Sequence, residues 1–482
     1  MTHRVFDSLR RSRIAAGVVT LLLAGCSSMA PNTDVPQLPL AQSWPGEAAA
    51  QGGAAAHTLY WRDYFAEPHL AALIEIALTN SSDLRLALLR VEEARALYGI
   101  QRAEQYPVLG VGAQGARART PGDLSYTGQP VVSSEYTAYA GLNSWEIDLW
   151  GRVRSLKDAA LQEYLATHEA QRAARIALIA EVASTYVTLR ALDERAAVAR
   201  ETIASREESL RIFSRRNEVG SASRLELTQV QTLLQQARSL GAQLEQQRAA
   251  QAHALVLLVG APLDLPQMSR TALRGDATLG ELAAGLPSDL LTVRPDIAAA
   301  ERRLRAASAN IGAARAAFFP RIALTGNFGT ASAELDGLFG TGSRAWSFAP
   351  TISLPIFDGG SRRASLDLAE VRRDIAVASY EKTIQTAFRE VADALSGRQW
   401  LGRQVQIQRE ALEAQTERAR LAKLRYDSGA AAYLEVLDAQ RELLEAQQQL
   451  IQTRGALLTN QVVLYAALGG GALDSTPTPT IP

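Results

Sequence analysis

An internal repeat constrains the fold of this chain more than any other feature of its sequence. The segment around Pro107 recurs around Pro320, at an offset of 320 − 107 = 213 residues. Further along, Gly220 matches Gly429 at an offset of 209. A sequence that repeats itself in this way is expected to use one structural unit twice. Each copy is predicted to contain a helix, two short strands and two very long helices.

Composition limits the class of protein. The 482 residues include 50 basic and 50 acidic side chains, and 47% of the residues are apolar. Such a chain is not disordered, and its balanced charge does not favour a nucleic-acid partner.

The amino terminus predicts export and a lipid anchor. Arg10, Arg11 and Arg13 precede an apolar run over residues 14–23, which is too short to span a bilayer and is typical of a signal peptide. The run ends before Cys26, the single cysteine of the chain, so no internal disulfide is possible. The setting resembles the lipobox of bacterial lipoproteins. It predicts cleavage after residue 25, acylation of Cys26 and, because Ser27 follows, transfer to the outer membrane. No cofactor other than this covalent lipid is expected.

Four segments show the period-two pattern of strands. From Arg344 onward, large apolar side chains alternate with small or polar ones; the apolar set is Trp346, Phe348, Ile352, Leu354 and Ile356. A weaker alternation over residues 134–150 would place Tyr139 and Trp145 on one face. An apolar face opposite a polar one suits a strand between lipid and a channel, although a soluble sandwich shows the same alternation.

Four strands are too few to close a transmembrane barrel, which needs about eight. After the signal, no segment is apolar enough to cross a membrane as a helix, so a membrane-spanning form requires a closed barrel. Closure by several identical chains is therefore predicted.

The helical segments are the largest parts of each copy. Residues 151–217 and 359–427 contain no proline, and at about 1.5 Å per residue each segment reaches roughly 100 Å. In the last helix apolar residues recur every seven positions, which predicts antiparallel coiled-coil pairs; they are Leu437, Leu444, Ile451, Leu458 and Tyr465. Gly220-Ser221 and Gly429-Ala430 mark the tips of these pairs, where the glycines are expected to end a helix.

Several motifs in order resemble the outer-membrane factors of tripartite efflux pumps, the lipoprotein branch of the TolC-like channels. They are residues 60–65 with 68–70, 286–291 with 294–297, 313–320, 357–360 and 433–440. The resemblance covers nearly all of the mature chain. It implies a mainly α fold with transmembrane β structure, in which a trimer forms a twelve-strand outer-membrane barrel and a long periplasmic α-helical barrel with an equatorial domain.

The resemblance also implies an order of domains. The signal peptide covers 1–25, the lipid anchor and equatorial segment 26–78, a helix 79–106, the first barrel hairpin 107–150 and the first long helical pair 151–261. The second copy has an equatorial linker at 262–292, a helix at 293–319, a barrel hairpin at 320–357, a long helical pair at 358–468 and an equatorial tail at 469–482.

The function implied by the resemblance is passive conduction of small molecules, such as antibiotics or other toxic compounds, from the periplasm to the exterior. Partners would be a periplasmic adaptor, contacting the tips at Gly220, Ser221, Gly429 and Ala430, and an inner-membrane transporter that largely selects the substrates. Motif position assigns the periplasmic gate to Tyr426 and Asp438, where three aspartates around one axis would repel each other and favour cations. Their repeat counterparts are Asn217 and Gln229.

Other functions are less well supported. The five histidines have no paired metal spacing and no nucleophile or acid-base constellation stands out, so an enzyme is not expected. A channel for protein secretion remains an alternative. A lipid-anchored periplasmic coiled-coil scaffold is a further alternative, but it would leave the apolar strand face in water.

Overall fold

A computed structural model describes residues 29–32, 36, 43–44, 54–263, 279–280, 282–285 and 287–471. The predicted signal peptide, Cys26 and the tail beyond residue 471 lie outside the described residues. The chain forms two compact units. The first unit includes Val91–Thr167 and Ala300–Tyr380; the second includes Gln37–Arg90, His168–Ala299 and Glu381–Pro482.

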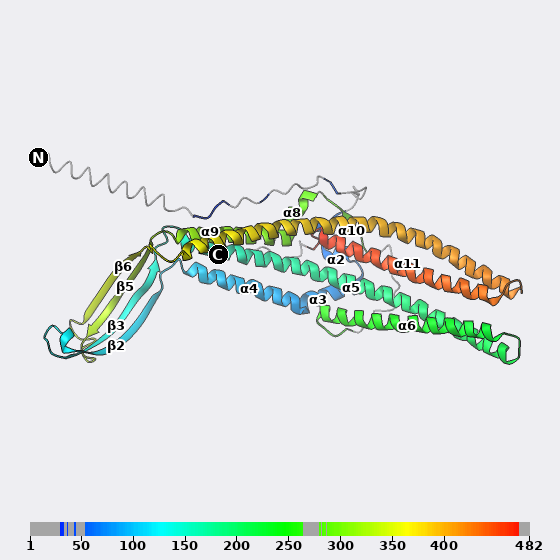
Figure 1. Cartoon of the computed structure of the whole chain (residues 1–482), viewed down its shortest axis with the longest axis horizontal. Helices are drawn as coiled ribbons and strands as arrows, with labels where there is room; N and C mark the ends of the chain where they lie inside the picture. Colours follow the sequence, from blue (N-terminus) through cyan, green and yellow to red (C-terminus); the bar gives the residue numbers. More distant parts are fainter. Residues whose placement is uncertain are drawn as a thin grey trace. The chain divides into compact units, whose positions relative to one another are not determined.

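The first unit contains a four-stranded antiparallel sheet of order β2-β3-β5-β6 (Figure 1). Its strands are β2 (Leu109–Thr120), β3 (Val131–Glu146), β5 (Arg321–Ser332) and β6 (Arg344–Ser353). The turn from β2 to β3 holds η2 (Gly122–Leu124). Each copy of the repeat supplies one hairpin, and β3 pairs with β5 to join the copies.

Strand pairing gives the sheet one strongly apolar face. Leu142 pairs with Leu109 on one side and with Gly326 on the other, and Gly326 pairs with Phe348. These four residues therefore lie on the same face of the sheet. Trp346 belongs to the same face and is 73% exposed. The opposite face carries small and polar residues, as the period-two pattern predicts.

One expectation about β3 is wrong. Tyr139 and Trp145 do not share a face, because a bulge between Leu142 and Trp145 inserts one extra residue into the strand. Ser144 in this bulge has a φ of 42°, and Trp145 then pairs with Leu324 on the apolar face. The bulge explains why the alternation of this strand is irregular in the sequence.

Each copy of the repeat also supplies one helix next to the sheet. They are α4 (Ser82–Ala103) and α9 (Pro295–Ala316). Within the first unit, Val91 and Ala94 of α4 pack against Tyr164.

Two helical hairpins contain most of the chain. α5 (Arg152–Glu218) and α10 (Ser361–Asp427) have 67 residues each, and they return through α6 (Arg224–Val259) and α11 (Tyr433–Ala467). The heptad positions Leu437, Ile451, Leu458 and Tyr465 of α11 are buried, as expected for a coiled-coil seam. Among the described residues, no helix has a stretch apolar enough to cross a bilayer.

The second unit has an aromatic core at the base of the hairpins. Trp61 and Leu282 are 1% and 2% exposed, and the Tyr64 and Tyr465 rings stack at 4.4 Å. This core brings together two of the segments expected to form the equatorial domain, those around Trp61 and Leu282. The surrounding short elements are β1 (Ala54–Ala55), η1 (Ala56–Thr58), α2 (Trp61–Tyr64), α3 (Pro68–Asn80), β4 (Leu282–Ala283), η3 (Pro287–Asp289) and α8 (Leu290–Val293).

Arg294 fastens this core to α10 and α11. Its guanidinium donates to Asp296 at 2.7 Å, to Glu390 at 2.8 Å and to the carbonyl of Ala467 at 3.0 Å. Burial opposes its charge, but the hydrogen bonds that it donates to the two carboxylates raise the pKa of Arg294 on balance. The two carboxylates and the carbonyl together satisfy a cation that is mostly removed from solvent.

Candidate functional site: the tips of the helical hairpins

Both hairpins turn at a glycine in the left-handed region. Gly220 has a φ of 76° and Gly429 a φ of 78°. The N–H of the next residue, Ser221 or Ala430, donates to the carbonyl five positions earlier at 2.8 Å in both tips. This is the Schellman ending of a helix, for which glycine is favoured because it has no Cβ.

The return helices begin differently in the two copies. Ser223 forms a capping box with Glu226, in which the Glu226 carboxylate accepts the N–H of Ser223 at 2.7 Å. These hydrogen bonds lower the pKa of Glu226. At the equivalent place in the second copy, Ala432 offers no side-chain cap, and Glu435 instead accepts from Arg425 of α10 at 2.7 Å.

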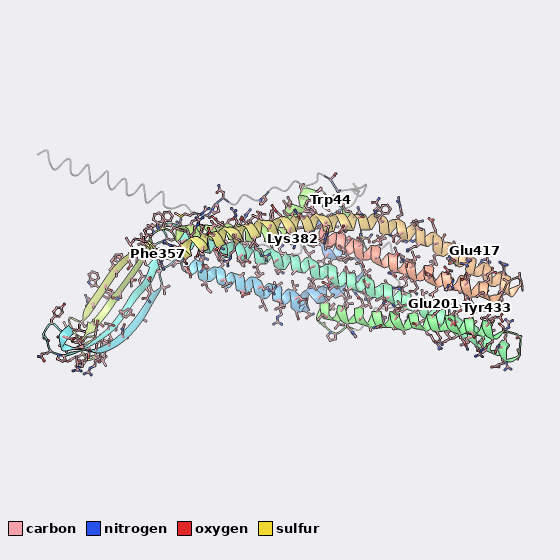
Figure 2. The ribbon with its side chains drawn as sticks, in the orientation of Figure 1. Trp44, Glu201, Phe357, Lys382, Glu417 and Tyr433 are labelled. Atoms are coloured by element: carbon pink, nitrogen blue, oxygen red, sulfur yellow. The ribbon has the colours of Figure 1, made fainter. Side chains whose placement is uncertain are left out.

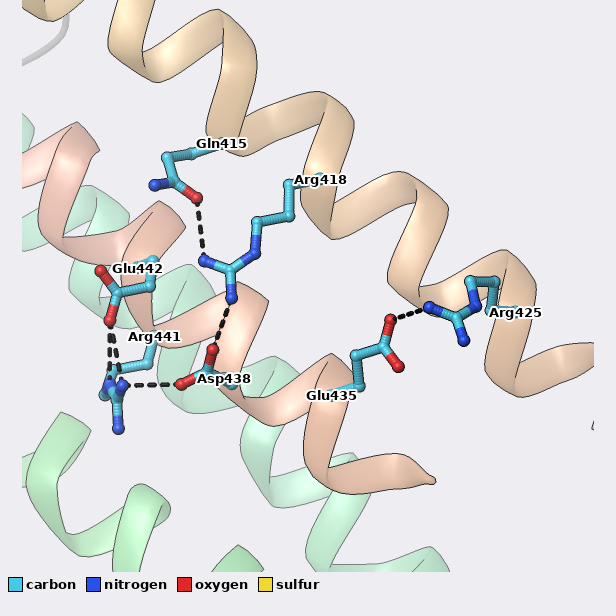
Figure 3. Close-up of polar contacts among 7 residues, drawn as sticks. All are labelled: Gln415, Arg418, Arg425, Glu435, Asp438, Arg441 and Glu442. Carbon is cyan, nitrogen blue, oxygen red and sulfur yellow. Dashed lines mark hydrogen bonds and ion pairs between the residues drawn. The ribbon is translucent and has the colours of Figure 1, made fainter. Parts of the chain in front are cut away.

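Asp438 of α11 lies between two arginines (Figure 3). One of its carboxylate oxygens accepts from Arg418 at 2.5 Å, and the other accepts from Arg441 at 2.7 Å. Arg441 also donates to Glu442 at 3.0 Å. Asp438 is therefore held by α10 as well as by its own helix α11.

Tyr426 connects the second tip to the first. Its hydroxyl accepts a hydrogen bond from Arg216 of α5. Its ring lies 4.9 Å from that of Tyr433, which in turn lies 4.3 Å from Phe213 of α5. Tyr433, labelled near the hairpin ends in Figure 2, also donates to Ser209 at 2.9 Å. The two tips of one chain are thus joined by an aromatic cluster with polar edges.

The repeat counterparts of the two predicted gate residues have other roles. Asn217 donates to the carbonyl of Ala222 at 2.9 Å and so holds its own turn. Gln229 and Asp438 both line a groove of about 310 Å³ between α6 and α11, and Arg441 lines it as well. Asp438 and its uncharged counterpart therefore line the same groove.

The family of this chain follows from comparison with known proteins. The outer membrane efflux protein family matches residues 73–261 and 286–470, which correspond to the two copies of the repeat. The chain belongs to this family. It is accordingly an efflux protein of the outer membrane that extends into the periplasm, and the resemblance found in its sequence is confirmed.

Individual relatives are similar over almost their full length. The outer membrane protein OprJ of Pseudomonas aeruginosa is 47% identical over 95% of this chain and 96% of its own length. The toluene efflux pump outer membrane protein TtgI of Pseudomonas putida is also 47% identical, over 94% of this chain and 96% of its own. The crystal structure of the open state of the Neisseria gonorrhoeae MtrE outer membrane channel superposes with a TM-score of 0.84 at 37% identity, covering 92% of this chain and 99% of that one.

Sequence reasoning about this efflux protein did not identify the arginines of the tips. A usable signal was nevertheless present, because residues at similar distances before and after a hairpin turn lie side by side. Arg418 lies eleven residues before Gly429 and Asp438 nine residues after it. Counting outward from the glycine would have placed this arginine beside this aspartate.

Proposed function

We propose that three copies of this chain form the outer-membrane channel of a tripartite efflux pump. The observation that carries the proposal is the sheet of the first unit, which has an exposed apolar face and two open edges. β2 and β6 lie at the ends of the strand order, and neither pairs with another described strand along its outer edge. Three such sheets joined edge to edge give 3 × 4 = 12 strands, enough to close a barrel.

Membrane physics supports closure. Backbone N–H and C=O groups on an open edge cannot find water in lipid, so each unsatisfied group costs several kcal/mol. β6 runs from Arg344 to Ser353, ten residues or roughly 33 Å of strand, and a tilt of about 40° reduces this to roughly 25 Å, the height of a barrel's apolar band.

The tips would gate the periplasmic end of the channel. Each chain contributes an Asp438 held by Arg418 and Arg441, and a Tyr426 held by Arg216. These bonds fasten α10 and α11 to each other and to α5. Opening then requires the second hairpin to give up ion pairs that are partly exposed and therefore individually weak.

The remaining assignments rest on the family. The hairpin ends at Gly220, Ser221, Gly429 and Ala430 would receive the helical hairpins of a periplasmic adaptor, which connects the channel to an inner-membrane transporter. The relative TtgI is named for toluene efflux, so small apolar or amphiphilic molecules are the proposed cargo. An acylated Cys26 would add a lipid anchor.

The test is a conductance measurement on the reconstituted full chain. Native mass spectrometry should first show a trimer. In a planar bilayer, Tyr426→Ala/Asp438→Ala should raise single-channel conductance severalfold, because both fastenings of the second hairpin are removed. A trimer whose conductance is unchanged by the double substitution would contradict the assigned gate, and a monomer without conductance would contradict the channel.

A further inference from the structure

The apolar face of the sheet carries three charged side chains, and all three are arginines. Arg117 and Arg119 of β2 lie on the same face as Leu109 and Val111, since the register of β2 with β3 is unbroken. Arg344 of β6 lies on the face of Trp346 and Phe348. Among the strand residues of this face there is no carboxylate.

These arginines gather at one end of the sheet. Arg344 is the first residue of β6, and Arg119 is the last but one of β2. Both strands adjoin the hairpin connections there, whereas their opposite ends adjoin the helices α4 and α10. In the proposed channel the helices extend into the periplasm, so the arginines would lie toward the outer leaflet of the membrane.

The arginines have no acidic partner of their own. All three are exposed, and none forms an ion pair within the part of the chain that the structure describes. A guanidinium facing lipid is unfavourable within the apolar band and tolerated at its edge, where headgroups begin. Trp346 is adjacent to Arg344 on this face, and Tyr136 pairs with Gly115 one step below Arg117, so aromatic side chains mark that edge.

We propose that Arg117, Arg119 and Arg344 bind the phosphate groups of a phosphorylated glycolipid in the outer leaflet, with its acyl chains against the apolar band. Guanidinium groups match phosphate oxygens in geometry and in charge. The three arginines and the apolar face together match an amphiphile that has anionic groups at one end and acyl chains at the other.

Closure of the barrel would complete the site. In one copy β2 and β6 are opposite edges of the sheet, three strand spacings or roughly 14 Å apart. This step rests on the proposed trimer, in which β6 of one copy pairs with β2 of the next. Arg344 would then lie on the strand next to the one that carries Arg117 and Arg119 of the neighbouring copy, so each seam would present one group of three arginines.

The experiment measures glycolipid binding to the purified full-length trimer in detergent by native mass spectrometry. The probe is lipopolysaccharide of the short-chain, doubly phosphorylated type, compared with the same lipid after enzymatic removal of its phosphates. Arg117→Gln/Arg119→Gln/Arg344→Gln should bind the phosphorylated lipid at least tenfold more weakly. The matched control, Arg85→Gln/Arg90→Gln/Arg409→Gln, removes three exposed helical arginines and should bind as the wild type does. The corresponding triple lysine variant should recover much of the binding, since it keeps the charge.

Wild-type protein alone already tests the proposal, because it should prefer the phosphorylated lipid tenfold or more, and less so at high salt. Equal binding of both lipids, wild-type binding by the glutamine variant, or equal retention of phosphatidylglycerol would overturn it. Trimer mass and conductance are recorded on the same samples. A conducting trimer without lipid preference would contradict the glycolipid site alone. A chain that never trimerises would contradict the proposed channel.

Discussion

Arg418 of α10 donates to Asp438 of α11 at 2.5 Å and thereby ties the two arms of the second hairpin together. The first hairpin has uncharged Gln229 at the position equivalent to Asp438. The two tips of one chain are therefore similar in backbone and different in charge.

Exchanging the two charges tests this tie. Arg418→Asp places a second carboxylate beside Asp438 and should raise single-channel conductance, while Arg418→Asp/Asp438→Arg should return it toward the wild-type value. The pair is partly exposed, so a coupling energy of about 0.5 kcal/mol is expected per chain. Arg420→Asp is the control, because Arg420 pairs with Glu417 on its own helix. Additive effects of the two exchanges would refute the tie.

Two glycines with the same backbone conformation should differ in their tolerance of alanine. Gly260 has a φ of 69°, and a Cβ there would lie 2.5 Å from the carbonyl oxygen of Asn80; Gly220 has a φ of 76° and nothing within 4 Å. Gly220→Ala should cost about 1 kcal/mol for the left-handed backbone, and Gly260→Ala about 1–3 kcal/mol more for the clash. Thermal unfolding in detergent measures both. Equal losses at the two sites would show that the contact with Asn80 is not rigid.

Arg294 should matter more than any surface arginine of α10. Arg294→Gln leaves the carbonyl of Ala467 and two carboxylates without their shared donor. Because both carboxylates are more than a third exposed to solvent, the expected loss in the free energy of unfolding is only about 1–2 kcal/mol. Arg389→Gln, which breaks a 3.8 Å pair with Asp393 at the surface, should cost less than about 0.5 kcal/mol. Urea unfolding measures the free energy of unfolding of both variants. An equal loss in the two variants would contradict the prediction.

The first tip should loosen in acid. The folded protein holds the pKa of Glu226 below its ordinary value of 4.5, since the carboxylate accepts hydrogen bonds from Ser223. The capping box is therefore fully stabilising above pH 4.5 and is lost as the pH falls through the lowered value. Hydrogen exchange at the start of α6 should quicken there, and Glu226→Gln should remove most of this pH dependence. The second tip, whose Ala432 provides no cap, serves as the internal comparison.

Much of the fold could be predicted because its signals are periodic. The spacing of Gly220 and Gly429 locates both turns, and heptads such as Leu437, Ile451 and Leu458 show which side of α11 is buried. Such patterns depend only on the geometry of a helix or a strand. They needed no information about distant contacts.

Contacts between distant residues could not be predicted in this way. The bulge at Ser144 reverses the face of Trp145, and no period reveals one inserted residue. Arg294 meets Glu390 and Ala467 only because three segments converge. The neighbours of the tip arginines were partly predictable, because they depend on where the hairpin turns.

In the proposed channel, the unpaired outer edges of β2 and β6 would affect how the chain enters the membrane. A single copy that entered the bilayer would expose a row of backbone groups on each side, so insertion and association would have to occur as one event. The rate of insertion should therefore rise steeply with chain concentration. A copy with a damaged edge strand should prevent the assemblies that it joins from closing and inserting.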